Sequence, residues 1–207
     1  MKQRCSVSAT FVFGMALVFP GAALARSVTD SGENLTITVQ VYNWAKVSPA
    51  TLEKGQTVAS EIFREAGIKL KWAGCPCEAT PKEPTLSLRI IPKLFGSTQS
   101  SFRSDHLGFA AVTEEGGVLA TVFFDRIDSL GKGGDLSGLL GLATAHELGH
   151  LLLGSKAHTP AGIMQPRWTR QQLWAAERNN FRFTLEQAEA IRSKVANQLS
   201  LGLALQQ

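Results

Sequence analysis

The chain has 207 residues, of which 44% are hydrophobic and 18% are charged, and its formal net charge is +4. Lys2 and Arg4 lie in a segment that we expect to be removed, which leaves 21 − 2 = 19 basic against 17 acidic residues, a surplus of +2. So small a surplus indicates no nucleic-acid partner, and the composition is that of one folded domain rather than a disordered or repetitive chain.

The first 25 residues have the pattern of a secretory signal peptide. Lys2 and Arg4 give a basic start, residues 11–19 form a short apolar run, and Ala23-Leu24-Ala25 is a small-residue cleavage site. We expect cleavage after Ala25 and a secreted or periplasmic domain spanning residues 26–207, without a membrane segment. The alternative is an uncleaved anchor, although the apolar run is short for a transmembrane helix.

The next part of the chain predicts a strand–helix–strand unit. Residues 35–44 (LTITVQVYNW) alternate between apolar and polar side chains and are rich in β-branched types, which favours a strand. Ser48-Pro49 is typical of a helix start, and apolar residues at helical spacing continue to Gly67. Two more strands are expected at 68–72 and 85–91, so this part indicates a mostly parallel sheet covered by a helix.

Two cysteines, Cys75 and Cys77, lie in the expected mature chain as a Cys-Pro-Cys segment. An oxidising compartment allows them to pair, but so tight a loop would be strained. Reduced thiols and a bridge to another chain stay open.

The middle of the chain predicts two further strands, at 108–113 and 118–124, and then a buried helix. Residues 136–153 (LSGLLGLATAHELGHLLL) are apolar almost all round, which is typical of a helix enclosed by its domain. Asp135 or Ser137 is the expected N-cap.

Within this apolar helix, His146, Glu147 and His150 are out of place unless something compensates them. His146 and His150 are four residues apart, so their imidazoles project from one face and can bind one metal ion. Glu147 can then reach a metal-bound water without being a ligand. His158 is the expected third ligand, because Gly154 ends the helix and lets the chain turn back. Three nitrogens would leave one tetrahedral position open, which is typical of catalytic zinc.

Two helices are expected at the C-terminal end. A short one is predicted at about 169–178, and a longer one begins at Thr184, which forms a capping box with Gln187. The whole pattern predicts an α+β domain with a twisted mixed sheet of about five strands, a long N-terminal helix, a buried central helix and a C-terminal helix.

The segment HELGHLLLGSKAHTPAGIMQP resembles the metzincin clan of zinc endopeptidases. The resemblance implies a single metzincin-like catalytic domain that binds Zn²⁺ through His146, His150 and His158. It implies that Met164 forms an apolar floor under the histidines, in the turn Gly162-Ile163-Met164. It further implies a substrate peptide added to an edge strand, which by position is Val118, Leu119, Ala120 and Thr121. An interior position for that strand is the alternative.

The spacing departs from the clan pattern HExxHxxGxxH by one residue before the glycine and one after it. An added helical residue turns the helix exit by about 100°, which the added loop residue must compensate. If His158 is not a ligand, Glu186 or Glu189 could complete a two-histidine, one-carboxylate site, as in gluzincin-like peptidases. Three imidazoles also suit other transition metals.

Two classes of function follow from these residues. The first is a secreted, monomeric zinc-dependent endopeptidase that hydrolyses extended peptides with Glu147 as general base. The second is a non-catalytic binding or envelope module that zinc merely stabilises.

Overall fold

The computed structural model describes residues 35–74, 84–94, 106–113, 117–131, 134–174 and 181–204. All of them belong to one compact unit, Glu33–Gln207. The expected signal peptide and the pair Cys75 and Cys77 lie outside the described residues. Within the described ranges, no helix combines the length and the apolar character needed to cross a bilayer.

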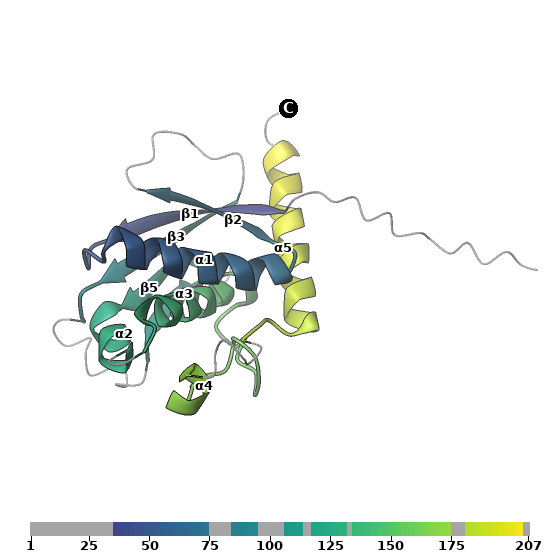
Figure 1. Cartoon of the computed structure of the whole chain (residues 1–207). Coiled ribbons are helices and arrows are strands. Elements are labelled where there is room, and N and C mark those ends of the chain that lie inside the picture. The colour runs from purple at the N-terminus through teal and green to yellow at the C-terminus, as the bar shows by residue number, and fades with distance from the viewer. Residues whose placement is uncertain are drawn as a thin grey trace, which may run out of the picture. The chain divides into compact units, whose positions relative to one another are not determined.

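The described strands form one mixed sheet in the order β2-β1-β3-β5-β4 (Figure 1). Four strands are parallel, and β4 alone runs antiparallel, beside β5. The strands are β1 (Thr36–Asn43), β2 (Lys69–Gly74), β3 (Thr85–Ile91), β4 (Gly108–Val112) and β5 (Gly117–Phe123). The structure therefore confirms a five-stranded, mostly parallel mixed sheet.

Five helices accompany the sheet in the described ranges. They are α1 (Pro49–Glu65), α2 (Phe124–Gly131), α3 (Leu136–Leu153), α4 (Arg170–Trp174) and α5 (Leu185–Ala204). The sequence predicted all of these except α2, which we expected to be a connection. Its apolar residues Phe124, Ile127 and Leu130 recur every third position, but eight residues are too few to establish a period.

Helices α1 and α3 pack against each other beside the sheet (Figure 1). Alternate residues of β1, Ile37 and Val39, are fully buried in the core on this side, as is Phe63 of α1. The two helices approach closely at Gly141, where a Cβ atom would lie 2.5 Å from the Cβ of Val58 and 2.6 Å from the carbonyl oxygen of Gly55. This close approach encloses α3 between α1 and the sheet.

Local capping sets the ends of α3. The side chain of Asp135 accepts a hydrogen bond from the N–H of Ser137, so Asp135 rather than Ser137 is the N-cap. At the other end Gly154 has φ +95°, a left-handed backbone conformation that L side chains rarely adopt. The N–H of Gly154 donates to the carbonyl of His150, and the chain leaves the helix there.

The expected edge strand is wrong. Val118, Leu119, Ala120 and Thr121 lie on β5, which pairs with β3 on one side and with β4 on the other. At this end of the described sheet the edge is β4, the strand before it in the chain. A short connection makes β4 and β5 antiparallel neighbours, but nothing local decides which of them also pairs with β3.

Candidate metal centre

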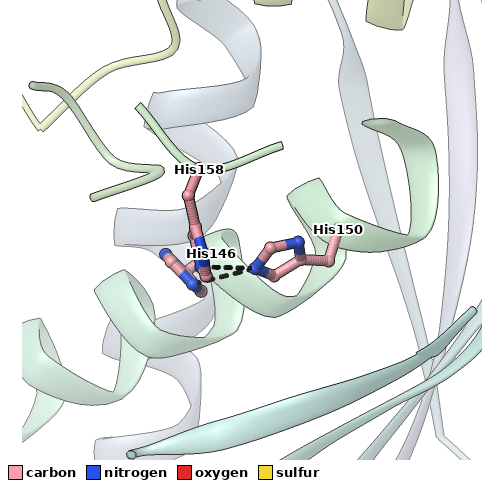
Figure 2. A group of neighbouring side chains, drawn as sticks. All are labelled: His146, His150 and His158. Atoms are coloured by element: carbon pink, nitrogen blue, oxygen red, sulfur yellow. Dashed lines mark hydrogen bonds between the residues drawn. The ribbon is translucent and has the colours of Figure 1, made fainter. Parts of the chain in front are cut away.

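Three imidazoles meet at one point on the open side of α3 (Figure 2). His146 and His150 project from one face of the helix, and His158 enters from the loop after Gly154. The Nε2 atom of His150 lies 3.1 Å from Nε2 of His146 and 3.1 Å from Nε2 of His158. In tetrahedral zinc sites with Zn–N bonds of about 2.0–2.1 Å, two ligand nitrogens are about 3.3 Å apart. The two distances from His150 are close to that geometry.

Backbone carbonyls determine where the first two imidazoles carry their protons. Nδ1 of His146 lies 2.8 Å from the carbonyl oxygen of Ile163, and Nδ1 of His150 lies 3.1 Å from that of Gly154. A carbonyl oxygen can only accept a hydrogen bond, so each Nδ1 carries the proton and each Nε2 presents a lone pair. The two lone pairs face each other and repel, unless a cation lies between them. The donor set therefore fits a metal ion, with each ligand oriented by a second hydrogen bond.

The longer spacing still brings His158 to the other two histidines. After the turn at Gly154 the loop folds back, and the N–H of Thr159 donates to the carbonyl of Met164. The nitrogens of all three imidazoles lie within 4.8 Å of one another. Among the described residues this is the one group of three or more histidine, cysteine or carboxylate side chains with such spacing. It contains neither Glu186 nor Glu189, both of which are exposed on α5.

Desolvation favours the neutral form of the three imidazoles. Desolvation lowers the pKa of His146 to about 3, and it also lowers the pKa values of His150 and His158. His150 is 7% exposed, whereas His158 lies at the surface. A neutral imidazole is the form that binds a metal ion, so the burial of this site favours coordination.

Glu147 is only 6% exposed, and burial raises the pKa of its carboxyl to about 8. A divalent cation nearby would stabilise the carboxylate form and bring that pKa down. The carboxyl reaches β4, because a Cβ atom built on Gly108 would lie 2.9 Å from Oε1 of Glu147. Gly108 therefore leaves the space that this side chain occupies.

The segment from Met164 to Trp168 packs against the metal-binding part of α3. Met164 is fully buried, and a Cβ atom on Gly149 would lie 2.7 Å from its sulfur. The ring of Trp168 stands edge-on to the ring of His146, with 5.4 Å between the ring centroids. These contacts place an apolar layer next to the histidines.

A cavity of about 270 Å³ opens over the three histidines and Glu147. One wall is residues 106–110, the start of β4, and the opposite wall includes Trp168. Leu130, Ala143 and Leu173 make part of the lining apolar. The sequence did not predict that His106 lies here, since a lone histidine in a polar loop gives no signal of its partners.

Known proteins resemble this chain in structure rather than in sequence. No protein-family model matches the chain, and no curated protein matches it. A zinc-dependent peptidase from Methanocorpusculum labreanum (strain Z) has a similar solved structure, with a TM-score of 0.50 and 14% sequence identity. The match covers 74% of this chain and 99% of that one. The two proteins share a fold. At this identity the likeness shows the fold alone.

Proposed function

We propose that this protein is a zinc-dependent peptidase, with His146, His150 and His158 as metal ligands and Glu147 as general base. The observation that carries the proposal is the convergence of the Nε2 atoms of the three histidines. The rings of His146 and His150 are oriented by hydrogen bonds from Nδ1–H to a backbone carbonyl. A peptidase with a similar fold supports the proposal. Zinc bound there would polarise a peptide carbonyl and lower the pKa of a bound water to about 7.

Glu147 supplies the proton transfer in this proposal. Its carboxylate lies beside the metal ligands and lines the same cavity. It accepts a proton from the attacking water and donates that proton to the departing amine, so the peptide bond breaks with both new termini correctly protonated. A buried carboxyl at an open cavity favours catalysis over the alternative of a module that zinc only stabilises, because stability alone requires no base there.

The finer assignments rest on further observations. The HExxH segment, the glycine at the end of α3, His158 and the buried Met164 support a place in the metzincin clan. The pattern of residues 1–25 supports secretion. Endopeptidase action is supported by β4, an edge strand of the described sheet whose residues 108–110 line the cavity and which can bind the middle of an extended chain.

The test is hydrolysis by the purified mature protein. We expect it to cleave an unfolded protein at internal bonds, to lose this activity completely on treatment with a zinc chelator, and to regain it when zinc is restored. Product sizes measured by mass spectrometry distinguish internal cleavage from release of terminal residues. Undiminished cleavage in excess chelator would refute the metal mechanism, and a zinc-loaded protein that cleaves nothing would favour the non-catalytic module.

A substrate bound along β4 gives a second prediction. The N–H of Phe123 donates to the carbonyl of Leu107, so in an antiparallel ladder the backbone groups of Gly108 and Ala110 point away from β5. The substitution Ala110→Pro removes one outward N–H and leaves the pairing with β5 intact. We expect KM for an extended peptide to rise roughly fivefold, as for a lost hydrogen bond of about 1 kcal/mol.

The matched control for this variant is Ala110→Ser, which keeps the backbone N–H and changes only the side chain. Zinc content and thermal stability of both variants should equal those of the wild type. Equal KM values for the proline and serine variants would show that the substrate does not pair with β4.

A further inference from the structure

The capping box at the start of α5 uses only half of the Gln187 side chain. Oε1 of Gln187 accepts a hydrogen bond from the N–H of Thr184 at 3.0 Å, and Oγ1 of Thr184 accepts one from the N–H of Gln187 at 3.2 Å. These two bonds complete the helix start. They need an acceptor at position 187, which glutamate would supply equally well.

The other half of the amide reaches the loop that carries His158. Nε2 of Gln187 donates to the carbonyl oxygen of Ala157 at 3.1 Å and to Oγ1 of Thr159 at 3.3 Å. These two residues flank His158 on either side. Gln187 is 8% exposed, so its amide is largely shielded from water. A buried N–H donor needs an acceptor from the protein, and these two oxygens supply it.

His158 depends on such support more than the other two ligands do. The imidazoles of His146 and His150 are each oriented by a backbone carbonyl at Nδ1. Within the described part of the chain, the polar contact found for the ring of His158 is the one between its Nε2 and Nε2 of His150, another metal ligand. The ring is also exposed. Its position is therefore set by its own backbone, and Gln187 holds that loop at the carbonyl of Ala157 and at the side-chain hydroxyl of Thr159.

Helix α5 is firmly attached, so it can act as the fixed partner. Ile191 and Val195 are fully buried. Nη1 of Arg192 donates to the carbonyl of Ala66 just after α1, and Nζ of Lys194 donates to the carbonyl of Leu151 in the last turn of α3. These two bonds join α5 to the segment after α1 and to the last turn of α3, the helix that carries His146 and His150.

We propose that Gln187 is a positioning residue for the third metal ligand, acting through the Ala157 carbonyl before His158 and the Thr159 hydroxyl after it. The inference rests on the proposed metal site and adds a specific role for the amide donor. It predicts that a residue able to cap α5 but unable to donate will weaken metal binding without releasing the helix.

The substitution Gln187→Glu separates the capping role of this side chain from its role as a donor. Glutamate keeps the acceptor for the N–H of Thr184 and loses both donations, to Ala157 and Thr159. Loss of a partner that orients a metal ligand typically weakens metal binding roughly 10- to 100-fold, and we expect a change of this size in the zinc Kd. Zinc affinity is measured by competition with a chromophoric chelator. The Co²⁺-substituted protein is compared in parallel, because its d–d absorption reports ligand geometry and should change in this variant.

The matched control is Arg192→Met, which removes another α5-to-backbone hydrogen bond, the one to the carbonyl of Ala66, outside the cavity. It should lower thermal stability while zinc affinity and the Co²⁺ spectrum stay as in the wild type. Wild-type zinc affinity in Gln187→Glu, or an equal loss in both variants, would overturn the positioning role while leaving the proposed function in place. A wild type that binds no zinc would instead overturn the proposed function itself.

Discussion

Replacing Glu147 with glutamine is expected to slow peptide hydrolysis by roughly 10²- to 10⁴-fold while the protein keeps its zinc. Glutamine has nearly the same shape, so it fits the space that Gly108 leaves at this 6% exposed position. An amide cannot accept a proton from the attacking water, and this single function is removed. Single-turnover rates and zinc content, measured on the same preparation, separate the chemical step from metal loss.

The control for this variant is Glu186→Gln, which neutralises an exposed carboxylate on α5 outside the cavity. It should hydrolyse peptide at the wild-type rate. If Glu147→Gln retained activity within a few-fold of wild type, another group would have to transfer the proton, and the role of Glu147 would be refuted.

The substitution His150→Ala is expected to abolish both zinc binding and hydrolysis. Nε2 of His150 is 3.1 Å from the Nε2 atoms of both other histidines, so it is the shared member of the cluster. Two ligands would remain, and neither Glu186 nor Glu189 lies in the group that could replace it. Zinc bound at 1,000 times its Kd stabilises a folded protein by about 4 kcal/mol, and the variant should lose the thermal stabilisation that added zinc gives the wild type.

His106 provides the matched control for this loss. It lines the same cavity but is not part of the metal-binding group, so His106→Ala should keep one zinc per chain. The variant His158→Ala is expected to retain weak zinc binding, because it loses only the exposed ligand and keeps the pair His146 and His150. Tight zinc binding by His150→Ala would place the metal elsewhere.

The features predictable from sequence are those determined within a few residues. Ser48 caps α1, and Thr184 caps α5 with Gln187, because in each case the side chain bonds to the backbone three residues away. The apolar run of α3 predicted its burial in the same way, and the i, i+4 spacing placed His146 and His150 on one face.

The features that sequence could not establish depend on distant parts of the chain. Whether β4 or β5 is the sheet edge depends on which strand pairs with β3, and both strands have suitable residues. The loop that carries His158 is bonded to Gln187, which lies 30 residues beyond its partner, the Ala157 carbonyl. His106 reaches the cavity because β4, the strand that follows it, lies beside α3, a contact that no local pattern encodes.

The most direct test of the metal site is the zinc content of the purified wild-type protein after incubation with zinc and removal of the excess. Inductively coupled plasma mass spectrometry should find one zinc per chain, and X-ray absorption at the zinc edge should show three imidazole nitrogens at about 2.0–2.1 Å. A folded protein that retains no zinc, or that binds zinc through fewer than three imidazoles, would contradict the account.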